Sequence, residues 1–432
     1  MIGRGQCLLF RLSERGNEAA PCHGVIRVSD PNIDTTRKHK IRHLPEDLAS
    51  AEYLCLLGSS NLFRSEIKEL FVSTAGQKTV NQKHIGSLPA PLPPLAEQHR
   101  IVEKVDELMA LCDRLEQQVG DQLEAHEVLV DTLLDALTRS SDAADLAENW
   151  ARIAEHFDTL FTTEASIDKL KQAILQLAVM GRLVEQDPND EPASVLLEKI
   201  AEEKARLVKE GKIKKPKKLP EIDEGETHFL IPSSWALARL GEVVEIVRGI
   251  TFPASEKSFT PENGRIACLR TSNVQDRIEW DDILYIRDSF VSKGSQYVRM
   301  HDIVMSMANS RELVGKVAII EKEPSEPTAF GGFLGVIRPI LLHPHFLMAV
   351  LRAPHARTAL IGGASQTTNI ANISISKLNP FVLGIPPLDE QHRIVQKVDE
   401  LMALCDQLKA RLGEAGKTRT HLAEAVVEQA VQ

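Results

Sequence analysis

The stretch EQHRIVEKVDELMALCD, which begins at Glu97, returns almost unchanged as EQHRIVQKVDELMALCD from Glu390. Across 97–116 and 390–409, only three of twenty positions differ. Each copy carries apolar side chains in alternating steps of four and three residues, which is the spacing of a heptad seam. The first seam consists of Ile101, Val105, Leu108, Cys112, Leu115 and Val119, and the second of Ile394, Val398, Leu401, Cys405, Leu408 and Leu412. This pattern predicts two long helices, each with a narrow apolar stripe that needs a partner helix.

Proline pairs mark where both helices start, because proline ends the preceding structure and fits the first turn of a helix. We expect the first helix to run from Pro93-Pro94 to about Thr138, and the second from Asp389 to about Ala430. Some 40 helical residues span roughly 60 Å. Two rods of equal length with near-identical seams are expected to pack on each other antiparallel, which gives the chain a pseudo-twofold repeat.

The likeness between the two halves extends upstream of each rod. A helical stretch at 51–70 and another at 345–362 are each followed by a loop rich in Gly, Gln and Thr, a short segment and a proline exit. The chain is therefore organised as domain–rod, domain–rod. Between the halves, an apolar helical period from Ile167 to Ala178 ends at Met180-Gly181, and a second helix is expected at 194–210.

Residues 229–385 are expected to form a complete globular α+β unit. Short alternating runs broken by Gly, Pro and Asn are typical of strands. The runs are Val243–Val247, Ile266–Arg270, Ile303–Met307, Lys316–Ile320 and Phe333–Arg338.

The composition excludes several classes of protein. With 432 residues, 43% of them hydrophobic and 26% charged, the chain has room for two to four domains. No apolar run approaches the roughly 20 residues that cross a bilayer, so we expect a cytoplasmic protein without a membrane partner. The six cysteines are scattered without a CxxC pair, which argues against metal and disulfide chemistry. Cys112 and Cys405 lie on the seams and are expected to be small core residues.

Charge is distributed unevenly along the chain. The net charge is −10, but 97–210 carries 12 basic and 26 acidic residues, whereas 228–385 carries 16 basic and 14 acidic residues. The acid therefore belongs to the helices, and the mild basic excess of the globular segment is compatible with a nucleic-acid partner. The run Lys212-IKKPKKLP is either a solvated tether, the more common case, or an arm that contacts phosphates.

No motif predicts catalysis. Asn379-Pro380-Phe381 lacks the second proline of a methyltransferase motif, and Gly331–Gly335 fits a turn into a strand better than a cofactor loop. The chain has no GxxxxGK[ST] sequence, and His343-Pro344-His345 has no further ligand at metal-binding spacing. His343 and His345 are expected to be exposed loop residues, and no cofactor is expected on this chain.

Loops with amide, hydroxyl and guanidinium groups are the remaining candidates. Arg pairs with guanine and Asn or Gln with adenine at base edges, although the same residue types also populate ordinary turns. The candidate DNA-binding residues in the second domain are Arg248, Thr251, Arg270, Ser272, Asn273, Gln275, Ser310, Arg311, Gln366, Thr367 and Thr368.

The doubled PPL-x-EQHRIV-x-KVDELMALCD motif, each copy following a globular domain, resembles the specificity subunit of type I restriction–modification enzymes. The segment from Lys169 to Pro220 is similar to the central conserved region of that family, and Phe229-LIPSSWALARLGEVV to the opening of a target recognition domain. The resemblance implies a non-catalytic chain of a type I site-specific deoxyribonuclease and adenine-N6 DNA methyltransferase complex. The implied partners are double-stranded DNA, two modification subunits and ATP-dependent restriction subunits, with S-adenosylmethionine, ATP and Mg held by those subunits.

The resemblance also implies a domain plan of α/β target recognition domains joined by two antiparallel coiled-coil helices. The expected parts are a partial recognition domain at 1–93, the first conserved helix at 94–140, a central helical region with its basic linker at 141–228, a second recognition domain at 229–388 and the second conserved helix at 389–432. The first domain is shorter than the second, and by analogy with Gln366-Thr367-Thr368 its candidate residues are Gln77, Lys78 and Thr79. The rods would hold two DNA half-sites roughly 18 base-pair steps apart. An alternative is a coiled-coil scaffold that has no role in DNA recognition.

Overall fold

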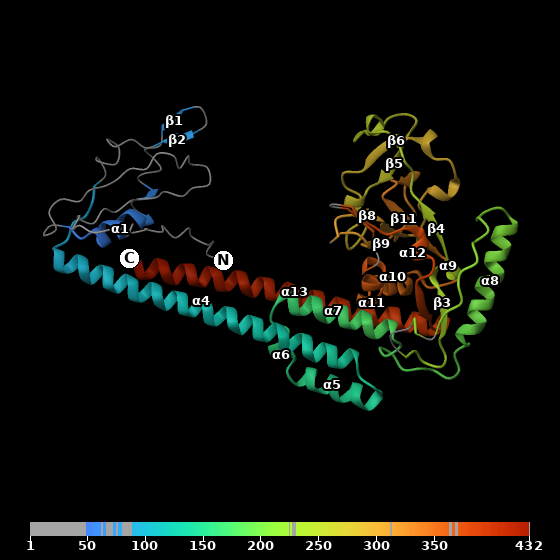
Figure 1. Ribbon diagram of the computed structural model, residues 1–432, viewed down its shortest axis with the longest axis horizontal. Coiled ribbons are helices and arrows are strands. Elements are labelled where there is room, and N and C mark those ends of the chain that lie inside the picture. Colours follow the sequence, from blue (N-terminus) through green and yellow to red (C-terminus); the bar gives the residue numbers. More distant parts are fainter. Residues whose placement is uncertain are drawn as a thin grey trace, which may run out of the picture. The chain divides into compact units, whose positions relative to one another are not determined.

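The computed structural model describes residues 49–61, 64–65, 72–74, 77–79, 89–223, 225–226, 230–311, 313–362, 365–367 and 370–431. They belong to two compact units, Met1–Ala125 and His126–Gln432. The boundary falls within one long helix, α4 (Leu95–Thr138), which contributes to both units (Figure 1). Most of the predicted domain 1–93 lies outside the described residues, so that domain stays a prediction.

The elements described in the first unit are copies of elements in the second, and each copy is displaced by 293 residues. The pairs are α1 (Ala51–Ser59) with α10 (Pro344–Arg352), β1 (Val72–Thr74) with β12 (Ser365–Thr367), β2 (Gln77–Thr79) with β13 (Ile370–Asn372), and α4 with α13 (Leu388–Val431). The antiparallel pairing of β1 with β2 also has the register in which β12 pairs with β13. A constant displacement without insertions confirms the predicted internal repeat.

Both long helices start on the same hydrogen-bonded junction. Gln98 accepts a hydrogen bond of 2.8 Å from the backbone N–H of the residue before α1, and donates one of 2.7 Å to a proline carbonyl before α4. Gln391 makes the corresponding bonds at 2.9 and 3.0 Å before α10 and α13. The participants are Ser50, Pro93 and Gln98 in the first copy, and His343, Pro386 and Gln391 in the second. The predicted proline-marked helix starts and the predicted end at Thr138 are confirmed.

Helices also fill the segment between the two long helices. They are α5 (Ala143–Glu155), α6 (Phe157–Leu160), α7 (Glu164–Val179) and α8 (Ala193–Lys209). Helix α7 begins at a capping box in which Thr163 and Ser166 satisfy each other's backbone N–H groups. It ends before Gly181, whose φ of +70° is a left-handed conformation that favours glycine. Both predicted central helices are thus present.

The partner of the second seam differs from the one expected. Where the sequence suggests the other rod, α7 packs along the first half of α13, and seam residues from Ile394 to Leu412 share one core cluster with the apolar face of α7. Ion pairs of Lys171 with Asp406 and of Lys409 with Asp168 flank this contact. The apolar face of α7 has the same period as the seam of α13, and its charges complement those of α13.

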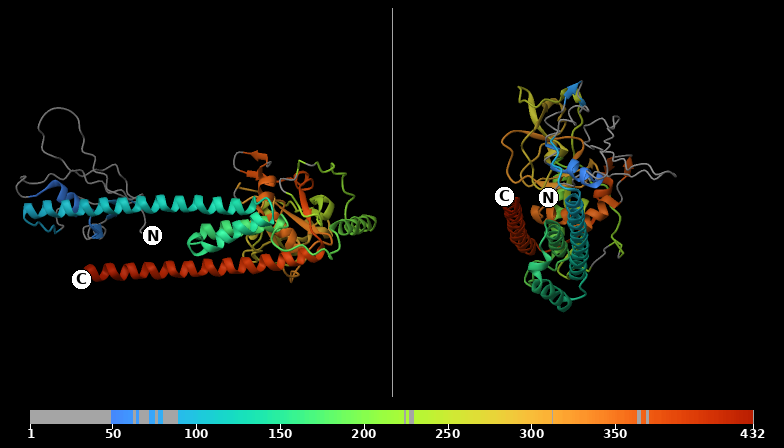
Figure 2. Two further views of the ribbon diagram at one scale, coloured as in Figure 1. Left: turned by 90° about the horizontal axis from the view of Figure 1, so that it is seen from below. Right: turned by 90° about the vertical axis from the view of Figure 1, so that its left-hand side faces the viewer.

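Helix α7 also packs on the end of α4. Lys169 forms an ion pair of 2.8 Å with Asp131, and Arg182 donates to the carbonyl of Ser140 at 2.5 Å. These contacts make α7 parallel to the end of α4 and antiparallel to α13. Within the second unit the two long helices therefore run in opposite directions with α7 between them (Figure 2). Direct pairing of α4 with α13 stays a prediction.

The two seam cysteines have different surroundings. Cys405 on α13 is buried beside α7, as expected for a small core residue. Cys112, at the matching place on α4, is exposed, so its predicted burial is wrong. Cys405 is buried because α7 packs on the seam of α13.

The globular part of the second unit contains mostly antiparallel sheets. Their strand orders are β4-β11-β7-β9, β10-β5-β6, β12-β13-β8 and β14-β3, and only β10 with β5 is parallel among these pairs. The remaining elements are β3 (Ala236–Arg239), α9 (Leu240–Val243), β4 (Val244–Arg248), β5 (Arg265–Leu269), β6 (Leu284–Arg287), β7 (Ile303–Ser306), β8 (Ala308–Asn309), β9 (Val317–Ile319), β10 (Thr328–Phe330), β11 (Leu334–Pro339), α11 (Pro354–Gly362), α12 (Ile375–Leu378) and β14 (Val382–Ile385), with 3-10 turns at Ala254–Glu256, Thr271–Asn273, Asp288–Phe290 and Gly294–Gln296. All five predicted strands are present within a residue or two of their expected bounds. The α+β class is confirmed.

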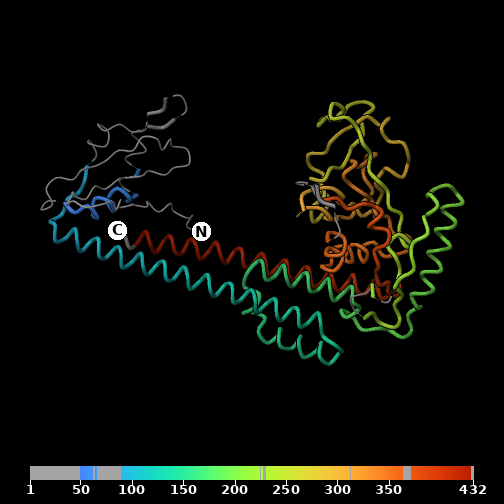
Figure 3. Tube along the Cα trace, in the orientation of Figure 1, coloured from blue at the N-terminus to red at the C-terminus, as the bar shows by residue number. Residues whose placement is uncertain are grey.

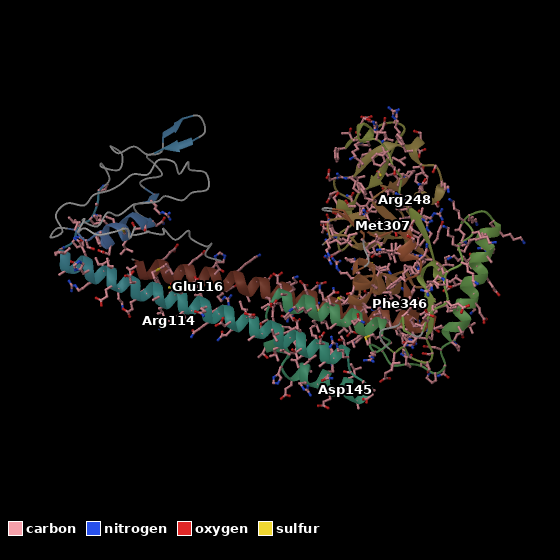
Figure 4. The ribbon with its side chains drawn as sticks, in the orientation of Figure 1. Arg114, Glu116, Asp145, Arg248, Met307 and Phe346 are labelled. Atoms are coloured by element: carbon pink, nitrogen blue, oxygen red, sulfur yellow. The ribbon has the colours of Figure 1, made fainter. Side chains whose placement is uncertain are left out.

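One core joins the helices to this sheet structure. Phe346 on α10 is fully buried and meets the ring of Trp235 edge-on at 6.3 Å between ring centres. The Trp235 indole N–H donates to Glu390 at 2.9 Å, at the start of α13. These contacts fix the orientation of the sheet structure on α13 (Figure 4 labels Phe346).

Candidate nucleic-acid interface

The structure brings three of the four predicted loops to one end of the β4-β11-β7 sheet. Arg248 is the last residue of β4 and lies opposite Gly335, while Leu334 on the same strand β11 lies opposite Ser306 of β7. The chain then passes from β7 into β8 through Met307, whose N–H bonds to the carbonyl of Phe333 at 2.8 Å. Figure 4 shows Arg248 and Met307 in the same part of the unit.

A close backbone approach shapes the turn after Arg248. A Cβ on Gly249 would lie 2.1 Å from the carbonyl oxygen of Gly331, so only glycine fits there. The hydroxyl of Thr251 lies beside Gly332 on the same turn. Gly331–Gly335 is therefore the turn into β11 that the sequence predicts.

The loop with Ser310 and Arg311 joins this end of the sheet through β8. Strand β8 pairs with β13, which pairs in turn with β12, the strand that carries Gln366 and Thr367. We call the residues gathered here the loop edge: Arg248, Thr251, Ser310, Arg311, Phe333, Gln366 and Thr367. Thr368 lies outside the described residues.

The loop edge carries exposed cationic groups. Arg248, Thr251 and Arg311 are exposed. Among the residues that the structure describes, neither guanidinium group has a side-chain partner. Phe333, which sequence reasoning missed, directly precedes β11 and is 66% exposed. Phe333 follows the turn at Gly331-Gly332, and this pair of glycines is the sequence signal that could have indicated its exposed position.

The fourth predicted loop, Arg270–Gln275, has a structural role. Asn273 is 2% exposed, accepts from the backbone N–H of Arg270 at 2.9 Å, and donates to two backbone carbonyls at 3.0 and 3.1 Å. Its amide is fully used in closing the turn, so base contact by Asn273 is incompatible with this conformation. Of the predicted residues in this loop, Ser272 is the exposed one.

Arg270 and Gln275 are also held by neighbours. Arg270 pairs with Asp282 at 2.7 Å and stacks over the ring of Phe259 at 5.1 Å from its centre. Gln275 accepts from the Lys316 ammonium at 2.9 Å. The sequence could not separate these contacts from base recognition, because both use the same functional groups.

The analogy between the two domains also needs correction. In the 293-residue register, Gln77–Thr79 on β2 corresponds to Ile370–Asn372, and Gln366-Thr367 corresponds to Ser73-Thr74. The sequence analogy matched Gln77 with Gln366 because the residue types are alike, and this match is four residues away from the register of the repeat.

Gln275 and Lys316 line a groove of about 1420 Å³ within the second unit. Helices α7, α10 and α13 and the end of α4 form its other walls, and several lysines and aspartates of α4, α7 and α13 line it. Most of these charges are paired across the helices, as Lys169 is with Asp131. Within the described ranges, no three His, Cys, Asp or Glu side chains are arranged to hold a metal ion.

Asn379-Pro380-Phe381 has the structural role that we expect for it. The three carbonyls accept, in order, from the backbone of Gly241, the guanidinium of Arg239 and the backbone of Leu240. A Cβ on Gly241 would lie 2.4 Å from the Asn379 side chain. The segment fastens β14 to β3.

Titratable side chains gather where α10 meets the start of α13. His343, half-buried before α10, lies 4.6 Å from His392 and 5.7 Å from His345 between ring centres. Burial and the neighbouring His392, His345 and His301 lower the pKa of His343 to about 4. Burial raises the pKa of Glu390, although hydrogen bonds from Trp235 and Gln186 favour its charged form. His343 and His345 are not the exposed loop residues that the sequence suggests, because both belong to this packed junction.

Comparison with known proteins identifies the family. The family described as "Type I restriction modification DNA specificity domain" matches residues 35–125 and 232–415. The EcoAI type I restriction enzyme specificity subunit of Escherichia coli is 40% identical over 408 residues, covering 92% of this chain and 67% of its own length. The EcoEI specificity subunit, also of Escherichia coli, is 37% identical, covering 92% of this chain and 68% of its own length.

A chain from a solved type I R-M system has a similar fold, with a TM-score of 0.51 and 20% sequence identity over 92% of this chain and 74% of that chain. The structure thus has two copies of a long helix, and its second unit carries a sheet domain whose polar loops gather at one edge. The chain belongs to the specificity-subunit family of type I restriction–modification systems. Within the described part of the chain, every helix is too short or too polar to span a bilayer.

Proposed function

We propose that this chain is the non-catalytic DNA sequence-recognition subunit of a type I restriction–modification complex. Each half of the repeat recognises one half-site of a bipartite target. The duplicated junction supports this proposal most directly, since Gln98 and Gln391 attach an equivalent nine-residue helix to an equivalent long helix.

The loop edge is the surface that we assign to base recognition in the second unit. Exposed guanidinium groups can form bidentate hydrogen bonds with guanine, and these contacts require that no protein group already occupies them. Arg248 and Arg311 meet this condition among the described residues, whereas Arg270 is paired with Asp282. The exposed ring of Phe333 lies beside them, where it can make apolar contact with a base.

The two long helices serve as a spacer in this proposal. Leu108, Leu115 and Val119 on α4 are 48 to 53% exposed, and Leu422 and Val426 on the last part of α13 are 64 and 57% exposed. We assign these unsatisfied stripes to antiparallel pairing of the distal parts of the helices, beyond the contact with α7. Helices with a fixed length would keep the distance between half-sites constant.

Modification subunits would dock on the acidic outer faces of α4 and α13, and restriction subunits would join through them. S-adenosylmethionine, ATP and Mg would be bound by those partners. The modification subunits would extrude the target adenine from the duplex.

Reconstitution tests this proposal. Modification subunits are purified with and without this chain and incubated with DNA and S-adenosylmethionine. Adenine methylation confined to one sequence motif, dependent on the chain, is the expected result. Methylation without the chain, or assembly without any DNA binding, would favour the scaffold alternative.

A further inference from the structure

The segment from Lys212 to Lys218 connects α8 to the sheet structure and carries five lysines. Lys214, Lys215, Lys217 and Lys218 are all exposed. Within the part of the chain that the structure describes, Lys212 alone of the five lysines here pairs with a carboxylate, that of Glu210 at 2.7 Å. Figure 3 shows the chain leaving α8 and returning to the sheet structure.

The upstream end of this segment is fixed on α8. Gly211 has a φ of +69°, and the N–H groups of Lys212 and Ile213 bond to the carbonyl of Leu207 at 3.0 and 3.4 Å. This arrangement closes the last turn of the helix.

The downstream end is held by a buried arginine. Arg239 is 2% exposed, and its guanidinium donates to the carbonyls of Pro220 and Glu221 at 2.7 and 2.6 Å. It also forms paired hydrogen bonds of 2.9 Å with the carboxylate of Glu226. Because both ends are held, the lysines have less conformational freedom than they would have on a free tether.

The middle of the segment approaches the sheet structure at Lys293. The ammonium of Lys214 is close enough to that of Lys293 to lower the pKa of Lys293. Lys293 belongs to the loop that contains Gln296, and Gln296 donates to the carbonyl of Arg248 at 3.5 Å. Like charges held together in this way favour an anion between or beside them.

We propose that Lys214, Lys215, Lys217, Lys218 and Lys293 form a phosphate-contacting strip that binds the DNA backbone beside the bases recognised by the loop edge. This inference rests on the proposed function and deepens it. Lysine ammonium groups on an extended backbone suit phosphates, which need charge without defined base geometry. Residues 214–218 reach at most about 18 Å, which is the rise of roughly five phosphates along one strand.

The chemistry of the strip favours a polyanion over a protein partner. Ile213 and Leu219 are half-buried against the chain itself, and the positions between them expose lysines and one proline. A protein interface normally buries apolar or aromatic anchors, which this surface lacks among the described residues.

The test measures DNA binding by the complete complex with its modification subunits as a function of salt concentration. K214A/K215A and K217A/K218A are compared with K199A/K322A, which removes two exposed lysines elsewhere. Each strip pair should lower the slope of log K against log salt by about 1.8, since each lost phosphate contact contributes about 0.9. Specific and non-specific DNA should lose affinity alike, and the methylated motif should stay the same. K217R/K218R should retain both slope and affinity.

An unchanged slope in both strip pairs would overturn the inference and leave a solvated tether. So would an equal slope change in K199A/K322A, or loss of a co-purifying protein with the slope intact. These outcomes are distinct from failure of the proposed function, in which the unaltered complex shows no sequence-specific DNA binding.

Discussion

Gln98 and Gln391 stand 293 residues apart and make the same two hydrogen bonds, one to the backbone before a nine-residue helix and one to a proline carbonyl. Both side chains are fully buried. Each glutamine ties the residue before a nine-residue helix to the start of a long helix. Duplication preserved this joint together with the seam.

Replacing Gln391 with alanine should therefore destabilise the second unit. The change leaves the N–H of His343 and the carbonyl of Pro386 without partners, at a cost of about 1–3 kcal/mol in the free energy of unfolding. Chemical denaturation of Q391A measures this cost. Gln396 is exposed on the same helix, so Q396A is the matched control. Equal stabilities of the two variants would contradict the role given to the junction.

Arg239 should control the protease sensitivity of the lysine strip. In R239A, the carbonyls of Pro220, Glu221 and Pro380 lose their donor, and the downstream end of the strip is released. Limited trypsin digestion should cut the variant between 212 and 218 several times faster than the unaltered chain. R265A is the control, because Arg265 is a partly buried arginine that bonds elsewhere in the same unit. Equal cutting rates in R239A and the unaltered chain would refute the clamp.

His343 should make stability depend on pH. Its pKa is lowered to about 4 in the folded chain from an ordinary value near 6.5, mainly by burial and then by His392, His345 and His301. The unfolded chain binds the proton more readily than the folded chain. The contribution of neutral His343 to the free energy of unfolding should therefore be fully present above pH 6.5 and be lost as the pH drops toward 4. Urea denaturation between pH 4 and 7.5 checks this dependence. H343Q should flatten the curve, whereas H421Q, at an exposed histidine, should leave it unchanged. A curve for H343Q identical to that of the unaltered chain would rule out this histidine as the cause.

Arg248 and Arg311 should contribute to base selection. If either forms a bidentate pair with guanine, its replacement by alanine should relax specificity at one base pair, with a loss of about 1–3 kcal/mol of discrimination. Methylation competition between cognate and singly changed sites measures this effect. R270A should alter stability more than specificity, because Arg270 is paired with Asp282. A uniform loss of affinity for all sequences in R248A and R311A would instead assign both residues to phosphate contacts.

The sequence predicts the helical frame well for a physical reason. Heptad spacing and proline starts are local signals, so the bounds of α4 and α13 fall within a residue or two of those expected. Which helix packs on a seam is decided by tertiary contacts. The sequence contains two helices whose apolar period fits the seam of α13, namely α7 and the other long helix. In the structure α7 packs on the seam of α13, where Cys405 is buried, whereas Cys112 on α4 is exposed.

The candidate site was less predictable. Asparagine closes turns with the same amide that it would offer to adenine, so Asn273 could not be assigned from its neighbours in sequence. Arg270 pairs with Asp282 of a separate loop, whereas Arg248 and Arg311 have no acidic partner among the described residues. Similarity of residue types also made Gln77 the counterpart of Gln366, whereas the matching strand pairs make Ile370 its counterpart in the second repeat.

Long-read mapping of adenine methylation tests the central claim most directly. DNA is methylated by the complex of this chain with its modification subunits, and every modified site is aligned. Two short specific half-sites separated by a constant number of unspecified base pairs are the predicted result. A single uninterrupted motif, or half-sites at variable separation, would contradict the view that two repeated modules on helices of fixed length select the target.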